Sequence, residues 1–421
     1  MRRPGQLFIR TQMIALAALL AAALAPLTAH AWTYKIAHSF CSLRFCVDGD
    51  DPRATPSAVA DPSDYFGTTV GGGPYKAGSI YELRYNALKD HWKAKSLYTF
   101  CESVCPQGYL PEGTLVEDVQ GDLYGTTFAG GSNNQGVIFE LDRSARKPEL
   151  RVLYNFAGTY PEPDLTYAGA ANGAPYDGSS PLYGADGNVV YELTRNGSEW
   201  VYSAAYTFPV GEVPYGLVFD VAGNLFGALG GGGDYGKGAI FKLTFSEGQW
   251  TPNILHSFCA RKGCADGQYP SAPAFDSAGN IFGVTYSGGT REKGCCGTIF
   301  ELTPNGTGWD FVNIYNFCAL RDCKDGANPS GPLLIDGTGS LFGVTRFGGG
   351  HDNDSGNEGG GTLFQWSAGT LTTLYRFCSR HFCQDGEYPT GGLRADAAGH
   401  ILGVTEAGGS SNSGTVFELS P

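Results

Sequence analysis

The stretch "FDSAGNIFGVTYSGG" (Phe275–Gly289), followed by "GTIFELTP" (Gly297–Pro304), decides the fold, because versions of both return along the chain. The first stretch returns as "GDLYGTTFAGG" (121–131), "GNLFGALGGGG" (223–233), "GSLFGVTRFGGG" (339–350) and "GHILGVTEAGG" (399–409). The second returns as "SIYEL", "VIFEL", "VVYEL", "AIFKL", "TLFQW" and "TVFEL". The chain is therefore built from internal repeats.

A further repeated element, such as "YNFC" or "YRFC", measures the period. It ends at Cys41, Cys101, Ala157, Pro209, Cys259, Cys318 and Cys378, at intervals of 60, 56, 52, 50, 59 and 60 residues. Each repeated element has four to seven residues, is rich in aromatic and β-branched types, and is bounded by Gly, Asp or Pro, which is typical of a strand. Seven units of four strands, named A to D in chain order, predict an all-β, seven-bladed β-propeller.

The two ends of the repeat array predict how the ring closes. "WTYKIAHSF" (32–40) supplies a strand D with no A, B or C before it, and "GTVFELSP" (414–421) ends on a strand C. We expect the N-terminal strand to join the last blade, which removes the exposed edges that an open array would leave.

Two short motifs have structural explanations. The D-x-x-G turn between strands A and B, as at Asp220, lets Asp accept hydrogen bonds from backbone N–H groups while Gly adopts a positive φ. The Gly of "FGVT", as at Gly283, is expected to allow a close backbone approach between blades.

The first 31 residues are predicted to be a signal peptide. "MRR" gives a positive start, Met13 to Leu24 form an apolar run, and "AHA" offers a cleavage site before Trp32. We therefore divide the chain into a signal peptide, residues 1–31, and one propeller domain, residues 32–421. The mature protein is expected to be secreted, extracellular or periplasmic, without a transmembrane segment and as a monomer.

The charge balance limits the partners. The chain has 41 acidic against 28 basic residues and a formal net charge of −13. Nucleic acids and anionic membranes require a basic footprint, so an acidic chain argues against both. Cations or neutral glycans are compatible with it.

The pattern "DxxGNLFGVTxxGG…GTVFELTP" resembles that of the bacterial GloVer repeat family, named after Gloeobacter and Verrucomicrobia. The similarity covers nearly the whole predicted mature chain and is weak only in the third repeat. The resemblance implies an exported, propeller-like array. It implies no activity and no catalytic residues.

The 12 cysteines are predicted to form local disulfides. Four pairs share the C-x4-C spacing and one has C-x3-C: Cys41/Cys46, Cys259/Cys264, Cys318/Cys323, Cys378/Cys383 and Cys101/Cys105. Zinc would need four ligands in one place, whereas these pairs belong to different blades. Closing a loop of six residues contributes about 2 kcal/mol, so the bridges stiffen loops more than they create the fold. Cys295 and Cys296 are adjacent and are expected to pair with each other, although a soft metal or distant partners are alternatives.

The face that carries the D–A and B–C connections is the predicted binding face, because loops on a rigid scaffold commonly carry function. We call the loops that these disulfides close the stapled loops, and four of them continue as C-x-D-G. The candidate binding residues are Asp48, Asp266, Asp325, Asp385, Arg44, Arg261, Arg321, Arg380 and His381. The alternative is that Asp-Gly is only the turn before strand A and that the arginines are solvated.

The loop "HDNDSGNE" (351–358) is a candidate calcium site through Asp352, Asp354 and Glu358. The order of its oxygen ligands does not match an EF-hand loop, so a solvated acidic loop is the alternative. No other cofactor is expected.

A catalytic site is hard to assemble from the sequence, and whether the protein is an enzyme stays open. No G-x-S-x-G, H-E-x-x-H or Walker-type motif is present. The strand A segments, such as "LVED" and "LRAD", are apolar apart from Glu117 and Arg394, which disfavours an axial active site. We expect a non-catalytic binding module for extracellular glycans or a protein partner. A polysaccharide- or lactone-acting enzyme and a purely structural surface protein are the alternatives.

Overall fold

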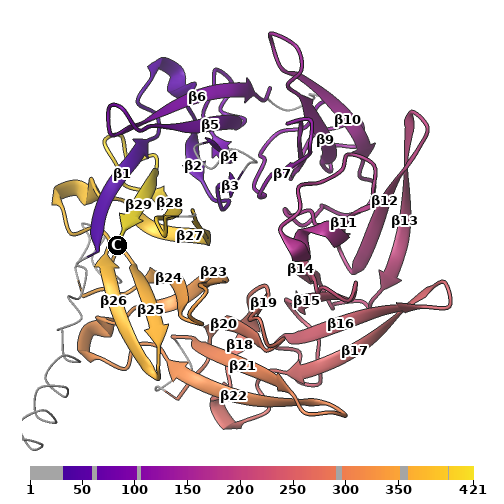
Figure 1. The fold of residues 1–421 in the computed structure, drawn as a ribbon, viewed down its shortest axis with the longest axis vertical. Coiled ribbons are helices and arrows are strands. Elements are labelled where there is room, and N and C mark those ends of the chain that lie inside the picture. Colours follow the sequence, from indigo (N-terminus) through magenta and orange to yellow (C-terminus); the bar gives the residue numbers. More distant parts are fainter. Residues whose placement is uncertain (1–31, 59–63, 102–105, 291–295, 351–358, 397) are drawn as a thin grey trace, which may run out of the picture.

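The computed structural model describes residues 32–421 with the exception of 59–63, 102–105, 291–295, 351–358 and 397. These residues form seven β-sheets that stand around a central axis like the blades of a propeller (Figure 1). The predicted seven-bladed, all-β propeller is confirmed. The predicted signal peptide lies outside the described residues, so it stays a prediction.

The strands of the first four blades are given from the inner side of the ring to the outer side. Blade 1 contains β2 (Asp50–Pro52), β3 (Ser57–Ala58), β4 (Asp64–Gly71), β5 (Ser79–Asn86) and β6 (His91–Thr99). Blade 2 contains β7 (Val116–Glu117), β8 (Leu123–Thr127), β9 (Val137–Asp142) and β10 (Glu149–Asn155). Blade 3 contains β11 (Leu182–Asp186), β12 (Val189–Asn196) and β13 (Glu199–Thr207). Blade 4 contains β14 (Pro214–Phe219), β15 (Leu225–Leu229), β16 (Ala239–Ser246) and β17 (Gln249–Ser257).

The remaining three blades follow the same order. Blade 5 contains β18 (Gln268–Pro270), β19 (Ala274–Phe275), β20 (Ile281–Ser287), β21 (Thr298–Pro304) and β22 (Trp309–Asn316). Blade 6 contains β23 (Ala327–Ile335), β24 (Leu341–Phe347), β25 (Thr362–Ser367) and β26 (Thr370–Arg376). Blade 7 contains β27 (Glu387–Ala395), β28 (Ile401–Ala407), β29 (Thr415–Ser420) and β1 (Thr33–Ser39).

The helices of the described chain are short 3₁₀ turns. They are η1 (Arg44–Cys46), η2 (Ala168–Asn172), η3 (Lys262–Cys264), η4 (Arg321–Cys323) and η5 (His381–Cys383). Within the described residues, no helix is long and apolar enough to cross a bilayer.

The expected four strands per blade need a correction at strand A. In blade 3 this position is reduced to two isolated bridges, Pro161 with Asp186 and Thr166 with Tyr183. In blades 1 and 5 it is split into two pieces, β2 with β3 and β18 with β19. Prolines between or at the ends of the pieces, such as Pro56 and Pro273, have no N–H to donate to the sheet, which explains the interruption.

The ring closes as predicted. β1 pairs antiparallel with β29, and Tyr34 lies opposite Leu419. In Figure 1 the first strand of the chain therefore lies beside the last one, within one blade.

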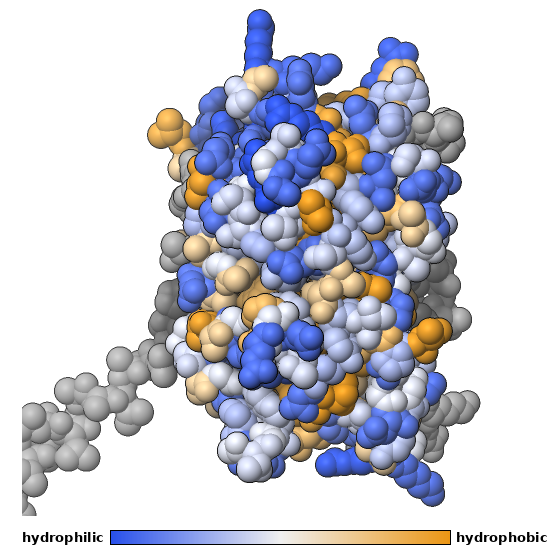
Figure 2. Space-filling model, turned by 90° about the vertical axis from the view of Figure 1, so that its right-hand side faces the viewer, coloured by the Kyte–Doolittle hydropathy of each residue, from blue (hydrophilic) through white to orange (hydrophobic). Residues whose placement is uncertain are grey.

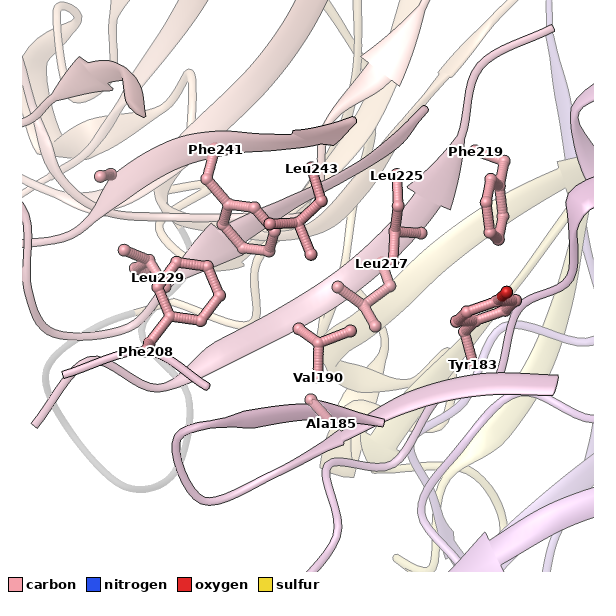
Figure 3. Packing of buried hydrophobic residues seen from close by; sticks show 11 residues of the cluster. Tyr183, Ala185, Val190, Phe208, Leu217, Phe219, Leu225, Leu229, Phe241 and Leu243 are labelled. Atoms are coloured by element: carbon pink, nitrogen blue, oxygen red, sulfur yellow. The ribbon is translucent and has the colours of Figure 1, made fainter. Parts of the chain in front are cut away.

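The core lies between neighbouring blades. Figure 3 shows one such cluster, in which Val190 of blade 3 faces Leu217, Leu225 and Phe241 of blade 4. Every residue of β15 is buried, because a middle strand has a neighbouring blade on each face. The outer strand β6 instead alternates exposed and half-buried residues over its first half. The edge of the ring on the side of β13 is accordingly mostly hydrophilic, with scattered apolar residues (Figure 2).

The glycine of the "FGVT" motif makes room for an aromatic ring of its own blade. Gly227 lies opposite Phe241 in the register of β15 and β16. A Cβ atom at Gly227 would lie 2.6 Å from the Cζ atom of Phe241. The expected close approach exists, but it lies within a blade and not between blades.

The turn between strands A and B is built as predicted. The Oδ1 atom of Asp220 accepts hydrogen bonds from the backbone N–H groups of Ala222 at 2.9 Å and Asn224 at 2.8 Å. Asp276, Asp336 and Asp396 make the same pair of bonds.

Candidate functional site

Seven segments, which we call joints, link strand D of one blade to strand A of the next. Joint 6/7 begins at Phe377, whose N–H donates to the carbonyl of Gly361 at 2.9 Å. It ends at Pro389, whose Cδ atom lies 2.6 Å from the position that a Cβ atom on Gly361 would take. Both ends of the joint thus meet at one glycine, and we call this arrangement of phenylalanine, glycine and proline the frame. It recurs with Gly78, Gly136, Gly238, Gly297 and Gly414.

Four of the long joints carry the predicted disulfides. The bonded pairs are Cys41–Cys46, Cys259–Cys264, Cys318–Cys323 and Cys378–Cys383. Cys101 and Cys296 are also disulfide-bonded, whereas Cys105 and Cys295 lie outside the described residues. Within the described part of the chain, no cysteine is free.

The four aspartates predicted to contact a ligand lie buried at the base of these loops. Asp48, Asp266, Asp325 and Asp385 are at most 2% exposed. The carboxylate of Asp385 accepts hydrogen bonds from the N–H groups of Ser379 at 2.9 Å and Arg380 at 3.1 Å. It also accepts one from the Tyr375 hydroxyl at 2.7 Å. These bonds close the loop, so a direct contact with a ligand remains a prediction that burial does not favour.

Strand D supplies a partner for each of these carboxylates. The partner is a tyrosine in joints 5/6 and 6/7 and a histidine in joints 7/1 and 4/5. Burial raises the pKa of Asp48, but hydrogen bonds from His38 and Ser42 outweigh burial and bring this pKa down to about 2. Burial lowers the pKa of His256 to about 4. His256 also stacks on Phe311 with ring centroids 3.8 Å apart.

The predicted basic residues lie at the exposed tips of the same loops. Arg44, Arg261, Arg321, Arg380 and His381 are all exposed. They belong to four different joints, so the structure places them on one face without bringing them together in one pocket.

A pocket of about 430 Å³ lies on the propeller axis, where the sequence had disfavoured a site. It is lined by residues at or next to the start of strand A in all seven blades, together with Tyr286 of strand B in blade 5. Because strand A follows the joint directly, the pocket lies at the centre of the face that carries the joints.

Carboxylates dominate one wall of the pocket. Glu112 comes from blade 2, and Glu162 and Asp164 come from the segment that begins blade 3. Arg53 lies beside them, with its guanidinium 3.4 Å from Glu112 and 2.7 Å from Asp51. The single cation of this group is thus already paired.

The pKa values of these carboxyl groups are raised. Burial, followed by the charges of Asp164 and Glu112, raises the pKa of Glu162 to about 7. Desolvation also raises the pKa of Asp164 and outweighs the hydrogen bond that its carboxylate accepts from the Thr114 N–H at 2.8 Å. Asp164 is nevertheless among the exposed residues. Glu162 therefore contributes its charge to the wall only near or above neutral pH.

Aromatic side chains from blades 4 and 5 also line the pocket. Tyr269 and Tyr286 of blade 5 line the pocket and are 39% and 40% exposed. Tyr215 of blade 4 is oriented by a hydrogen bond from its hydroxyl to the carbonyl of Pro270. The pocket combines hydrogen-bonding carboxylates with half-open rings, which is the usual composition of a small-molecule site.

The structure offers no metal centre among the described residues. The close groups of potential ligands there consist of disulfide cysteines, in one case with Glu387, and bonded sulfurs are not thiolate ligands. The predicted calcium ligands Asp352, Asp354 and Glu358 lie outside the described residues, so that site stays a prediction.

Sequence reasoning missed the pocket because it examined the wrong half of strand A. The apolar segments such as "LVED" begin after the pocket residues. A usable signal existed in the preceding pieces "DPRAT", "LPEGT", "YPEPD", "VPYGL", "YPSAP", "NPSGP" and "YPTGG". Each has a proline at its second position, whereas the residues after that proline differ from blade to blade.

Several solved structures are similar to this chain. A fungal alcohol oxidase of the AA5 family in complex with copper has a TM-score of 0.53 at 13% identity, over 93% of this chain and 76% of the oxidase. A polysaccharide lyase of family PL25, an ulvan lyase, has a TM-score of 0.53 at 12% identity, over 88% and 94%. YCF48 from Cyanidioschyzon merolae has a TM-score of 0.50 at 11% identity, over 92% and 98%. These identities show the fold alone.

Comparison with curated protein sequences gives no match. A family model does match, over residues 169–417, which is more than half of the chain. Its repeat is the one that the "FGVT…GG…GTVFEL" pattern predicted. This chain belongs to the Gloeobacter/Verrucomicrobia repeat family.

Proposed function

We propose that this protein is a binding module that acts outside the cytosol and holds a glycan in its axial pocket. The observation that carries the proposal is the pocket itself, to which every blade contributes on the loop-rich face. Its volume of about 430 Å³ falls within the range of small-molecule sites and is small for a protein surface. The disulfides are compatible with an exported protein.

The lining favours a neutral or amino-bearing sugar. The carboxylates of Glu112, Glu162 and Asp164 can accept hydrogen bonds from hydroxyl or amino groups. Arg53 is held by Asp51 and Glu112, so it adds little attraction for an anionic sugar. The half-exposed rings of Tyr269 and Tyr286 offer an apolar face against which a sugar ring can pack.

A titration of the mature chain with neutral and amino-sugar oligosaccharides tests the proposal. By isothermal calorimetry we expect binding of one of them, weakened at least tenfold in Tyr286→Ala. Tyr235→Ala is the matched control, because Tyr235 is also exposed, at 52%, and does not line the pocket. No binding across the panel, or equal effects of the two variants, would contradict the proposal.

A second candidate function, turnover of the same glycan, is favoured by one observation. The pKa of Glu162 is about 7, and a carboxyl group that is half protonated near neutral pH can serve as a general acid or base. In that case Glu162→Gln should retain binding and abolish turnover, and the rate of the wild type should change around pH 7. Binding without measurable turnover would leave the binding role and remove the enzyme.

A purely structural role is the remaining alternative. It predicts no ligand, and the pocket is a reason to prefer a binding role. A panel of oligosaccharides that never changes the melting temperature would restore the structural role.

A further inference from the structure

The tips of three consecutive joints, 5/6, 6/7 and 7/1, share a composition that the axial pocket does not use. Each tip places an arginine beside an apolar residue, and we call this set the tip arc: Leu320, Arg321, Arg380, Phe382, Arg44 and Phe45. The apolar members are open to solvent, with Phe45 64% and Phe382 65% exposed. An aromatic ring so exposed on a soluble protein is a candidate contact for a partner.

The charge of the tip arc is opposite to that of the chain. The chain has a formal net charge of −13, yet each of these three tips carries an arginine. The aspartates at the base of the same loops are buried and hydrogen-bonded within the loop, as for Asp385. In these three loops, which are fully described, Asp322 is the one exposed carboxylate, and it lies 3.6 Å from the Nε atom of Arg321. The unpaired positive charge of the tip arc therefore comes from Arg44 and Arg380.

The backbone at the tips is strained where an aromatic ring is displayed. Phe45 has φ 63° and Phe382 has φ 54°, which lie in the left-handed region that disfavours bulky residues. At the same place in joint 4/5 stands Gly263, with φ 70°. The turn can therefore be made by glycine without strain, so its geometry does not require phenylalanine.

The loops are also longer than the connection needs. Phe377 and Pro389 are twelve positions apart, whereas Phe156 and Pro161 span the same frame in joint 2/3 with five. The additional residues form a stapled loop, and the tip is the part of this loop that projects into solvent. Length, strain and charge thus point to the same residues.

We propose that the tip arc is a second binding surface, separate from the axial pocket, and that it takes an anionic polysaccharide. The rings of Phe45 and Phe382 pack against sugar rings, and the neighbouring guanidinium groups pair with carboxylate or sulfate groups. The arginine and phenylalanine recur at the two successive joints 6/7 and 7/1, which suits a ligand whose own groups repeat along a chain. Joint 5/6 adds Leu320, with its arginine paired to Asp322. Arginine suits this role because its planar fork matches both anions.

The test uses the mature chain and two polymers, polygalacturonate for carboxylate and dextran sulfate for sulfate, with neutral dextran as control. Binding is measured by affinity electrophoresis at low salt and at 150 mM salt. We expect at least one anionic polymer to retard the protein, with an effect that falls as salt rises. Neutral dextran should have no effect at the tip arc.

The decisive variant is Phe45→Gly combined with Phe382→Gly, which copies the backbone of joint 4/5. Glycine relieves the strain, so the melting temperature should rise by a few degrees while polymer affinity falls at least tenfold. Arg44→Gln with Arg380→Gln should weaken binding similarly. The matched control is Lys93→Gln with Lys95→Gln, which removes two exposed charges from β6, away from the tips.

The outcomes separate this proposal from the pocket. Glu162→Gln should leave polymer binding unchanged, since Glu162 lies in the pocket wall. Failure of both anionic polymers to bind, or binding that both tip variants leave intact, would overturn the proposal. Binding to vesicles containing phosphatidylglycerol, lost in the glycine variant and not matched by either polymer, would assign the surface to lipid and would also overturn it.

Discussion

Joints 6/7 and 2/3 solve the same connection in two ways. Each begins at a phenylalanine that donates its N–H to a glycine carbonyl, and each ends at a proline packed on that glycine. Joint 2/3 does this with four intervening residues and no cysteine, whereas joint 6/7 uses eleven, including a disulfide pair. The long version is an Ω-like loop whose ends meet and whose body leaves the ring.

The difference teaches that the staples serve the loop and not the propeller. A joint that remains short has little entropy to lose and needs no bridge. A longer loop is held by a disulfide and by the buried carboxylate of Asp385. Rigid loops of this kind carry side chains at low entropic cost on binding.

The two kinds of joint also divide the face of the ring. The short joints, 2/3 and 3/4, are neighbours, and the segment after joint 2/3 carries Glu162 and Asp164 of the pocket wall. The basic tips belong to the long joints. The face therefore has two pocket carboxylates, Glu162 and Asp164, beside a short joint and a basic arc on three of the long ones.

The largest effect is expected from the carboxylate that closes the long loop. Asp385→Asn places an amide N–H₂ against backbone donors, so we expect a loss of about 2 to 3 kcal/mol in the free energy of unfolding. Asp322→Asn is the control, because that side chain is 61% exposed and asparagine tolerates its positive φ. Guanidinium unfolding measures both. Equal stability of the two variants would mean that Asp385 does not hold the loop.

Removal of a staple should cost somewhat less. Cys378→Ser with Cys383→Ser opens a loop of six residues, and the chain-entropy model gives about 2 kcal/mol for it. The unfolding midpoint should fall while the β-sheet signal in circular dichroism stays unchanged. A double variant that no longer forms the propeller would show that the staple supports the fold, against the comparison with joint 2/3.

The sequence predicted the scaffold well because scaffold residues repeat. Phenylalanine and proline return at all seven joints and glycine at six of them, with Asn188 at joint 3/4. The D-x-x-G turn returns with its hydrogen bonds, so period and strand order followed from the pattern. The pocket could not be found in this way, because binding positions such as Glu112, Glu162 and Tyr269 differ from blade to blade. Their convergence depends on ring closure, which places residues distant in sequence around one axis.

The pH dependence of stability tests Glu162, which lies next to the short joint 2/3. The pKa of Glu162 is raised to about 7 from an ordinary value near 4.5, so the folded state binds this proton more tightly than the unfolded chain does. Stability from this group is therefore present below about pH 4.5 and is lost as pH rises through 7.

Glu162→Gln should remove that loss. At pH 8 we expect the variant to be more stable by about 1 to 2 kcal/mol, less than the full shift would give because water reaches the channel. At pH 4.5 the two proteins should unfold alike. Glu247→Gln, in an exposed turn, controls for loss of a charge. A variant less stable than the wild type at pH 8 would indicate that the Glu162 charge is stabilised in the pocket.

The smallest effect on stability is expected from exchanging one joint for the other. Replacing residues 378–388 by the four residues 157–160 keeps both ends of the frame, Phe377 and Pro389. The variant loses the bonds of the stapled loop, including that from the Gly409 N–H to the Cys383 carbonyl, but it also orders seven fewer residues. We expect the two terms to offset within about 1 kcal/mol in guanidinium unfolding.

The same variant separates the two uses of the face. It removes Arg380 and Phe382 from the tip arc and leaves Glu112, Glu162 and Asp164 of the pocket in place. Anionic polymer binding should therefore fall while sugar binding in the pocket persists. If the exchange instead unfolds blade 7, the long joint belongs to the fold, and the argument that its additional residues exist for the surface fails. A variant that remains stable but no longer binds the polymer would show that the additional residues of the loop serve binding at the tip and not the fold.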